Sequence, residues 1–500
     1  MKGVMVQGTS SDSGKSFIAT ALCRIFSDMG YNVCPFKSQN MSNNSYVTAD
    51  GLEMGRAQGV QAEAARVEPQ AFMNPILLKP RKDVSSEIVL MGKVYDAPCD
   101  KNYYKDFTMG KGIETVREAL SIINKNFDLM VCEGAGSPAE INLNAGEIAN
   151  MRVAREADVP VILVTDVDRG GSLASVVGTL ELLGEDRERV KGIIFNKFRG
   201  DISLFQDAVE WVEKRTGVKV VGVMPWLTDI IIEGEDILSL NWNSGSGDCE
   251  EKLRVGVVKF PRVSNHTDIE AFRFEPDVEI VELSSPAQLS RLDAVVLPGT
   301  KSTVLDMKYL IDSGLAEGIR RFYEKGGTVY GLCGGYQMMG EKIDDSHLRD
   351  NDKIPEIEGL GLLPAVTTFG EEKTVIRRRG RAIHPYFTEK TPIDGYEIHF
   401  GVTVPTRDDP KFAPLFELDG RSSDGLACAD LRAAGSYLHN AFHNDLFRAA
   451  WLNALRRRRG LPERAPVSTA AAKEAAYDAL AAHARENLDI DYIVKISGVK

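Results

Sequence analysis

The sequence is poor in cysteine and has no long apolar run. Its seven cysteines in 500 residues are odd in number and show no paired spacing, which favours reduced thiols in a cytoplasm over a disulfide framework. None belongs to a spacing typical of zinc ligands. No stretch of about 18 apolar residues is present, so we expect no membrane-spanning helix. The opening residues MKGVMVQGTSS also lack the apolar core of a signal peptide.

Basic residues are outnumbered by acidic ones. With 60 Lys and Arg against 72 Asp and Glu, the formal net charge is -12. Non-specific nucleic-acid binding requires a basic surface, so we expect small-molecule partners and no nucleic acid. The hydrophobic share of 43% is typical of a globular protein. Because 500 residues exceed what one core usually organises, we expect more than one domain.

Up to about residue 225, short apolar runs alternate with longer segments of helical period. This alternation predicts a parallel sheet with crossover helices. A polar, glycine-rich stretch between Leu238 and Lys252 then predicts a linker. The predicted strands are Gly3 to Gln7, Asn32 to Phe36, Leu129 to Glu133, Val159 to Thr165, Val190 to Asn196 and Val218 to Val223.

A second alternating series follows the linker and predicts a second α/β domain. After Leu446 the residues are mostly Ala, Arg, Glu and Leu, with Ser468 and Thr469 placed to cap a helix over Ala470 to Glu486. We therefore expect an α/β chain with two doubly wound domains at 1–230 and 253–445, a linker at 231–252 and a helical tail at 446–500. The predicted strands of the second domain are Arg254 to Phe260, Val278 to Leu283, Ala294 to Pro298 and Thr328 to Leu332.

A glycine-rich loop ending in Gly-Lys-Ser follows the first predicted strand. Its backbone amides would face a phosphate at the start of the next helix. Lys15 would reach the β and γ phosphates, and the Ser16 hydroxyl would bind Mg²⁺. A glycine-rich turn without a ligand is the alternative. The predicted nucleotide-binding residues of the loop are Gly8, Thr9, Asp12, Ser13, Gly14, Lys15 and Ser16.

Glu133 ends the strand LMVCE and enters a glycine-rich turn. A carboxylate at the carboxyl edge of a parallel sheet is well placed to hold the metal ion of the nucleotide. The alternative is a strand-end acid that faces solvent.

The segment TVYGLCGGYQ predicts a strand, a sharp turn at Cys333 and a helix. Small flanking residues permit a strained turn that exposes the side chain of a nucleophile. The amide of Gly334 would face a developing oxyanion, and so would the backbone at Gly299 and Thr300 after another strand. The alternative for a lone cysteine is a buried small apolar residue.

His439 follows a short strand-like run about a hundred residues beyond Cys333. It is the natural base for a cysteine nucleophile. The alternative is an ordinary histidine with its hydrogen bonds satisfied.

Both halves resemble known families. The loop has five residues between Gly8 and Gly14 instead of four, like the dethiobiotin synthetase relatives, which activate carboxylates with ATP. That resemblance implies that Asn196 recognises the purine base. Residues 253–445 resemble the class I glutamine amidotransferase domain, with a flavodoxin-like sheet. The common form of that domain has a glutamate two residues after the histidine. Here that position is Ala441, and Glu397 is a candidate to orient the imidazole.

Residues 1–445 together resemble the cobyric acid synthase family. The resemblance implies that ATP and glutamine are used to amidate the b, d, e and g carboxylates of a corrinoid, adenosylcobyrinic acid a,c-diamide. The signatures that carry it are Pro35 to Ser45, Met73 to Pro80 and Glu133 to Asn142.

Polar residues after the second strand would lie where substrate carboxylates approach the γ-phosphate. These candidate substrate residues are Lys37, Gln39, Asn40 and Asn44, and turn chemistry is the alternative for each. Glu53 is a further candidate metal ligand.

Two other functions compete with this one. The first is the same chemistry on another polycarboxylate, as in cobyrinic acid a,c-diamide synthase or a cell-wall precursor amidase. The second is a non-catalytic partitioning-type ATPase scaffold, which the intact Cys333 turn and His439 argue against. The oligomeric state stays open.

Overall fold

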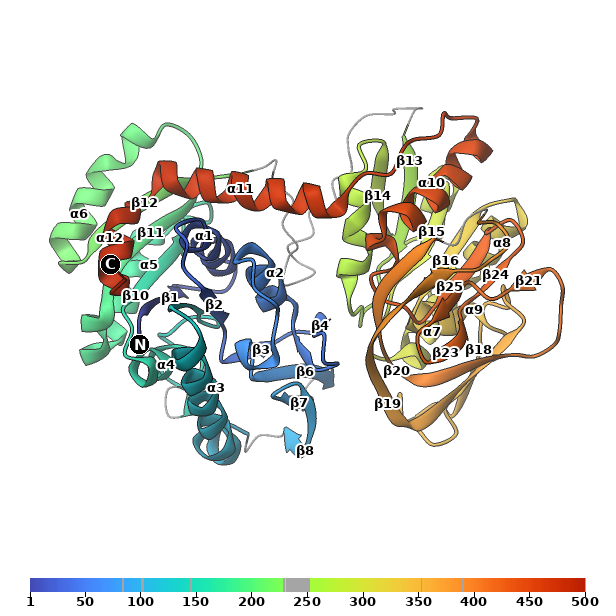
Figure 1. Ribbon diagram of the computed structural model, residues 1–500, viewed down its shortest axis with the longest axis horizontal. Coiled ribbons are helices and arrows are strands. Elements are labelled where there is room, and N and C mark those ends of the chain that lie inside the picture. Colours follow the sequence, from blue (N-terminus) through green and yellow to red (C-terminus); the bar gives the residue numbers. More distant parts are fainter. Residues whose placement is uncertain are drawn as a thin grey trace. The chain divides into compact units, whose positions relative to one another are not determined.

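A computed structural model of the chain describes residues 1–82, 85–99, 103–143, 146–227, 230, 252–351, 353–387 and 391–499. The chain divides into two compact units, which Figure 1 shows as ribbons. The first unit comprises Met1–Glu235 and Lys473–Lys500, and the second comprises Asp236–Ala472. Residues 231–251 of the predicted linker lie outside the described residues.

Six parallel strands form the main sheet of the first unit, in the order β12-β11-β10-β1-β9-β2. All six predicted strands of this half are present. They are strongly apolar because a parallel sheet is covered on both faces, and every residue of β1 and β9 is buried. Their bounds are β1 Gly3–Gly8, β2 Val33–Phe36, β9 Leu129–Glu133, β10 Val161–Asp166, β11 Val190–Phe198 and β12 Lys219–Pro225.

Helices connect these strands, and two small sheets lie between β2 and β9. The main helices of the unit are α1 Lys15–Asp28, α2 Arg56–Ala64, α3 Ile113–Asn126, α4 Met151–Ala157, α5 Ser172–Leu182 and α6 Gln206–Thr216. One small sheet joins β3 Gln39–Met41, β6 Ile76–Lys82, β7 Ser85–Leu90 and β8 Lys93–Cys99, and the other pairs β4 Ser45–Val47 with β5 Glu53–Gly55.

The second unit has a seven-stranded sheet in the order β14-β13-β15-β16-β25-β24-β21. It contains all four predicted strands, which are parallel to one another. The strands are β13 Leu253–Val258, β14 Val278–Leu283, β15 Ala294–Leu297, β16 Thr328–Leu332, β21 Phe412–Ala413, β24 Leu426–Cys428 and β25 Ala433–Ser436. Its helices are α7 Thr303–Asp312, α8 Leu315–Glu324, α9 Gly334–Met339 and α10 Asp445–Arg459.

The second unit also contains a further sheet, which the sequence pattern did not predict. Its longest strands, β19 and β20, form an antiparallel pair that runs through most of both strands. The strands are β17 Lys342–Asp344, β18 Glu356–Glu358, β19 Ala365–Ala382, β20 Pro392–Pro405, β22 Phe416–Leu418 and β23 Arg421–Asp424.

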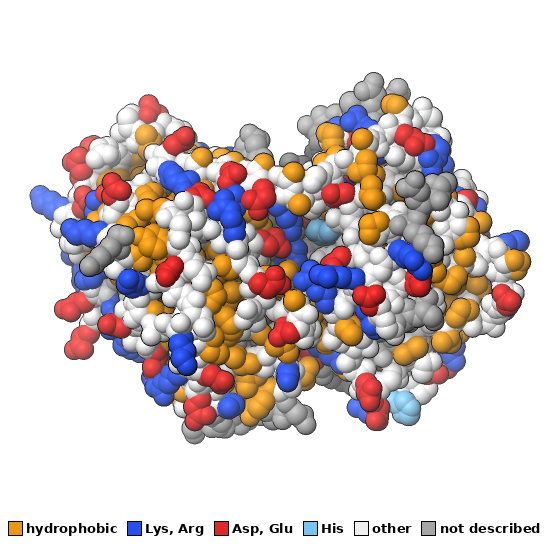
Figure 2. Space-filling view, viewed as in Figure 1, with side chains coloured by type: hydrophobic (Ala, Val, Ile, Leu, Met, Phe, Trp, Pro, Cys, Tyr) orange, Lys and Arg blue, Asp and Glu red, His pale blue; other side chains and the backbone are white. Residues whose placement is uncertain are grey.

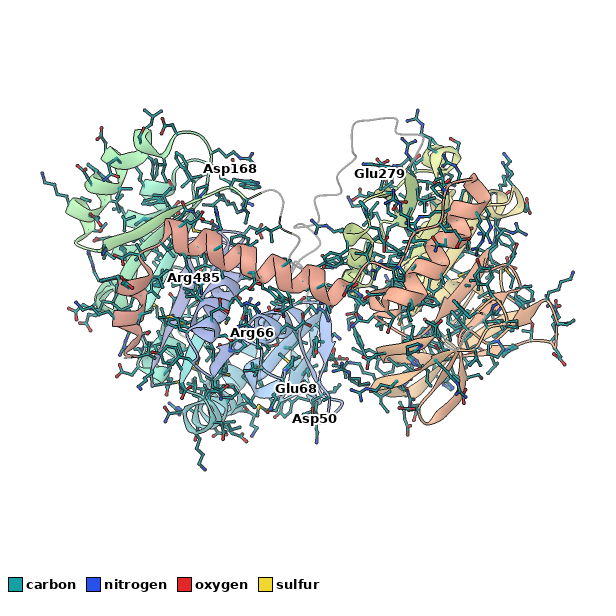
Figure 3. The ribbon with its side chains drawn as sticks, turned by 45° about the horizontal axis from the view of Figure 1, so that its top comes forward. Asp50, Arg66, Glu68, Asp168, Glu279 and Arg485 are labelled. Atoms are coloured by element: carbon teal, nitrogen blue, oxygen red, sulfur yellow. The ribbon has the colours of Figure 1, made fainter. Side chains whose placement is uncertain are left out.

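The two last helices, α11 Thr469–Asn487 and α12 Ile490–Ser497, contribute to the core of the first unit. Ser468 caps α11 as predicted, because its Oγ accepts the Ala471 amide at 3.3 Å. Arg66 and Arg485, both labelled in Figure 3, donate to the two oxygens of Asp28 at 2.7 and 2.8 Å. The helical tail therefore divides between the units, with α10 in the second and α12 in the first.

Acidic and basic side chains are intermixed over the face of the first unit drawn in Figure 2. Among the described residues, no helix combines the length and apolar character needed to cross a membrane.

Candidate functional site

The phosphate-binding loop connects β1 to α1 and has a conformation that requires glycine at its end. Gly14 has a φ of 97°, and a Cβ there would lie 1.9 Å from Asn196 Nδ2. The Asn196 amide donates to the Ser13 carbonyl at 3.0 Å. Ser13 Oγ is buried and has no hydrogen-bond partner among the described residues. Asn196 at the end of β11 therefore holds the loop, and the Ser13 hydroxyl is available for a ligand.

Other side chains brace the same loop. Lys197 Nζ donates to the Asp12 carbonyl at 2.5 Å and to Asp166 Oδ2 at 2.9 Å. Thr9 Oγ1 donates to Thr165 Oγ1 at 3.0 Å. These contacts come from the carboxyl ends of β10 and β11, where a parallel sheet usually binds its ligand.

Glu133 is the centre of a buried polar cluster at the end of β9. Its Oε1 accepts from Ser16 Oγ at 2.7 Å and from Lys37 Nζ at 3.0 Å. Its Oε2 accepts from Gln61 Nε2 at 2.6 Å. The structure therefore joins the two predicted metal ligands with one predicted substrate residue. Lys15 Nζ, from the same loop, donates to the Ser10 carbonyl at 3.0 Å.

The other predicted substrate residues lie on β3 (Gln39 and Asn40) and directly before β4 (Asn44). Asn40 and Asn44 are buried, and Gln39 is half-buried. The Asn44 carbonyl accepts the Arg56 amide at 3.2 Å, where α2 begins.

Glu53 forms a buried ion pair with Lys79. Its carboxylate also accepts from Ser45 Oγ at 2.5 Å. A role for Glu53 as a metal ligand stays a prediction.

Cys333 occupies the sharp turn between β16 and α9. Its backbone has φ 50° and ψ -108°, a strained conformation for a non-glycine residue. A Cβ on Gly335 would lie 2.0 Å from the Leu297 carbonyl oxygen, and one on Gly331 would lie 2.6 Å from the Tyr336 amide. Only small flanking residues fit, as the sequence pattern predicted. The Cys333 residue is 8% exposed.

His439 forms a buried pair with Asp268. The distance from His439 Nδ1 to Asp268 Oδ2 is 2.6 Å, and both side chains are 1% exposed. The Asn440 amide donates to Asp268 Oδ1 at 2.7 Å. Burial alone would lower the pKa of His439. The negative charge of Asp268, the neighbouring Cys333 and hydrogen bonds to both raise that pKa to about 10. The protonated imidazolium is therefore favoured beside Cys333.

The predicted oxyanion groups border the same space. A Cβ on Gly334 would lie 3.2 Å from the Thr300 amide nitrogen, and one on Gly299 would lie 3.3 Å from His439 Cε1. Thr300 is fixed by a hydrogen bond from its hydroxyl to Asp306. The loops that carry Gly334 and Thr300 therefore adjoin, and Gly299 adjoins His439.

Comparisons with known proteins cover both halves. Residues 4–238 match the family described as "CobQ/CobB/MinD/ParA nucleotide binding domain", and residues 254–447 match "CobB/CobQ-like glutamine amidotransferase domain". Cobyric acid synthase of Geobacillus thermodenitrificans is 46% identical over 492 residues, 98% of this chain and 97% of that protein. The enzyme of Desulfitobacterium hafniense is 43% identical over 511 residues, 99% of this chain and 98% of that protein. The chain belongs to the cobyric acid synthase family.

Membership of the cobyric acid synthase family confirms the resemblance. The remaining question is which residue orients the imidazole of His439. Ala441 stands where the common amidotransferase form has glutamate, and Glu397 was the expected substitute. Glu397 is not that partner, because its carboxylate accepts from Arg378 Nε at 3.0 Å across the β19-β20 pair. Asp268, on the 3₁₀ helix His266–Phe274, holds Nδ1 instead. Nothing local singled out Asp268 beforehand, because its segment HTDIEAFRF carries a second acid, Glu270.

The Ser16 and Glu133 pair fits a magnesium ion. Mg²⁺ prefers oxygen ligands and usually takes one or two from the protein, with phosphate and water completing its shell. A hydroxyl and a carboxylate 2.7 Å apart at the end of the phosphate loop match that pattern. Among the described residues no group of three or more His, Cys, Asp or Glu side chains could hold a metal alone, so the phosphates would have to complete the site.

Proposed function

We propose that this chain converts the b, d, e and g carboxylates of adenosylcobyrinic acid a,c-diamide into carboxamides. ATP supplies the driving force and glutamine supplies the nitrogen. The observation that carries this proposal is the full-length match to cobyric acid synthases. Each unit also has a polar cluster of its own, around Glu133 in the first unit and around Cys333 and His439 in the second. Five described cysteines are free thiols, which supports a cytoplasmic location.

In the second unit, we assign Cys333 as the nucleophile and His439 as its acid and base. The thiolate attacks the side-chain carbonyl carbon of glutamine, and the oxyanion accepts hydrogen bonds from the Gly334 amide and the backbone at Gly299 and Thr300. The imidazolium of His439 donates its proton to the departing nitrogen, so ammonia leaves. Water, deprotonated by the same imidazole, then hydrolyses the thioester to glutamate. Asp268 keeps the ring oriented throughout.

In the first unit, the loop from Gly8 to Ser16 holds the phosphates of ATP. A substrate carboxylate oxygen attacks the γ-phosphorus, the bond to the β,γ-bridging oxygen breaks, and an acyl phosphate and ADP form. Ammonia then attacks the acyl carbon and expels phosphate. Lys15 stabilises the charge that develops on the transferred group. Magnesium, held by Ser16 and Glu133, would neutralise the β and γ oxygens.

Further residues of the first unit would recognise the two substrates. Asn196 is proposed to bind the purine base while it braces the loop. Lys37 is proposed to guide the carboxylate, because its ammonium already lies on Glu133 at 3.0 Å. Gln39, Asn40 and Asn44 are proposed to contact the corrinoid.

Two variants test this division of labour. Cys333→Ser should abolish glutamine-dependent amidation but retain synthesis from ammonium salts, because ammonia no longer has to be released from glutamine. Lys15→Gln should lose amidation from either nitrogen source yet still hydrolyse glutamine. Corrinoid products, ADP and glutamate are measured in parallel. If folded Cys333→Ser lost both activities, or Lys15→Gln amidated normally, the assignment would be wrong.

A further inference from the structure

The second unit contains a cavity at the edge of its sheet opposite to Cys333. Its volume is about 650 Å³, within the range of about 300–1,000 Å³ that small-molecule sites occupy. Asp293 and Gly327 in its lining directly precede the parallel strands β15 and β16, whereas Cys333 directly follows β16. Because β16 is five residues long, about 15 Å of strand separates the cavity from the glutaminase centre. Neither of the proposed reactions uses this cavity.

Helices α8 and α10 and the 3₁₀ helix Pro286–Arg291 give the cavity an apolar lining. A Cβ on Gly318 of α8 would lie 2.7 Å from Leu289 Cδ1, and one on Gly327 would lie 2.3 Å from Phe322 Cε1. Glycine therefore lets α8 approach the 3₁₀ helix and lets the Phe322 ring lie against the turn after α8. An apolar group of a ligand would lose its contact with water against this lining. Its apolar residues are Pro286, Leu289, Leu292, Phe322 and Leu455.

The cavity lining also carries an excess of positive charge, although the chain as a whole has a net charge of -12. Asp293 is the one acid among the described residues of the lining, and it is paired with Arg459 at 2.7 Å. Arg321 is paired with Glu317 at 2.8 Å. Two of the four lining cations are thus already neutralised. The four are Arg321, Lys325, Arg458 and Arg459.

Lys325 and Arg458 have no carboxylate partner within the described part of the chain. Arg458 Nη1 donates to Thr328 Oγ1 at 2.6 Å, and its Nη2 donates to the Asp430 carbonyl, so both acceptors are uncharged. Partial burial lowers the pKa of Arg458 even though the nearby charge of Asp430 raises it. The positive charge of Arg458 is therefore incompletely compensated, as expected where an anion binds.

We propose that this cavity binds the phosphate monoester of a ring-bearing small molecule, with the phosphate on Lys325 and Arg458 and the ring on the apolar lining. A phosphate monoester carries about two negative charges near pH 7 and three acceptor oxygens, which suits two cations that come from different helices. A carboxylate would balance only one of them. Phosphate alone would leave most of the volume empty and the apolar lining uncovered. The site goes beyond the proposed function and does not depend on it.

Hydrogen–deuterium exchange of the full chain, titrated with 1-naphthyl phosphate, tests the site by its position. Exchange at residues 318–327 and 455–460 should slow as the probe binds, and its concentration dependence gives a Kd for the cavity. Binding in the phosphate loop of the first unit would instead slow exchange at residues 8–16. Inorganic phosphate and 1-naphthoate should bind in the cavity about tenfold or more weakly, because the first lacks the ring and the second has a single charge.

A variant with Lys325→Gln and Arg458→Gln should raise the Kd for 1-naphthyl phosphate in the cavity about tenfold or more, because it removes both phosphate contacts. Its glutamine hydrolysis should match wild type. The matched control combines Lys308→Gln and Arg379→Gln, whose side chains are 51% and 76% exposed, and should change neither value.

Lys325→Gln alone serves as a second variant should the loss of Arg458 disturb folding, since Lys325 is an exposed side chain. It should raise the same Kd severalfold. Slower exchange at residues 8–16 alone, or an unchanged Kd in a folded Lys325 variant, would overturn the inference. Equal affinity of the cavity for the three probes would overturn it as well, because the cavity would then not select a ring and a phosphate together.

Discussion

The buried pair of His439 and Asp268 sets the charge of the glutaminase centre. Because the pKa of His439 is raised to about 10 from 6.5, the folded chain binds a proton there that the unfolded chain releases. The pair therefore stabilises the fold fully below about pH 6.5 and loses this contribution as pH rises through about 10. Over the neutral range the imidazolium stays beside Cys333.

Replacing the carboxylate tests whether Asp268 positions the histidine. In Asp268→Asn the pKa of His439 should fall, since the charge and hydrogen bond that raise it are weakened. Glutamine hydrolysis should drop on the order of 100-fold or more, and alkylation of Cys333 by iodoacetamide at pH 7.5 should slow. The pH profile of the alkylation should shift to higher pH.

Asp312→Asn, which removes an exposed carboxylate paired with Lys308, is the control for this experiment. Both alkylation and hydrolysis should match wild type there. A purely structural role of Asp268 would instead leave the pH profile of the folded variant where it is in wild type.

Residues within a local motif could be identified from the sequence, whereas their partners could not. Lys15, Ser16 and Cys333 stand in recognisable loops whose backbone geometry depends on neighbouring glycines. Asp268 and Gln61 act on groups far along the chain, and no local spacing connects them. Their roles follow from the tertiary fold, which brings each within 2.6 Å of its partner.

At the level of elements, the sequence predicts that α11 is a helix but does not predict that it packs against α1. Its Leu480, Ala481 and Ala484 are fully buried in one core cluster with Ile18 and Leu22 of α1. Arg24 of α1 donates to Glu474 and Asp478 of α11 at 2.7 and 2.6 Å. The alanine-rich composition suits such close packing, and the helix completes the nucleotide-binding unit.

Shortening one buried side chain should measure this contribution. Leu480→Ala should lower the free energy of unfolding of the first unit by about 2–5 kcal/mol, because it removes apolar contacts and leaves a cavity. Thermal or urea unfolding, monitored together with ATP binding, measures this change in the free energy of unfolding. Leu182→Ala, where the leucine on α5 is 49% exposed, should change little. Equal effects of the two substitutions would contradict the packing role.

The main strands were predictable because each is a short apolar run bounded by polar turns. The small sheet containing β3 and the sheet containing β19 were not predicted. Strands such as β3 and β17 span only three residues each, too few to show a period. The long strand β19 contains the charged runs EEK and RRR and few apolar residues, so its pattern does not resemble a buried strand.

At the scale of the whole molecule, the chain combines two chemistries that depend on each other. The second unit would release ammonia, and the first would generate the acyl phosphate that ammonia attacks. Family membership over nearly the full length supports both reactions in one chain, and each unit has its own core. The substrate claim therefore requires the second unit to release ammonia from glutamine and the first unit to amidate the corrinoid.

Mass spectrometry of adenosylcobyrinic acid a,c-diamide incubated with the chain, ATP, Mg²⁺ and glutamine tests that claim most directly. Each acid-to-amide conversion lowers the mass by about one unit. With unlabelled glutamine the account predicts four such steps, and a product that is heavier by about one unit per step when the glutamine amide carries ¹⁵N than when it does not. An unchanged corrinoid mass with unlabelled glutamine, while the same sample hydrolyses glutamine and binds ATP, would contradict it.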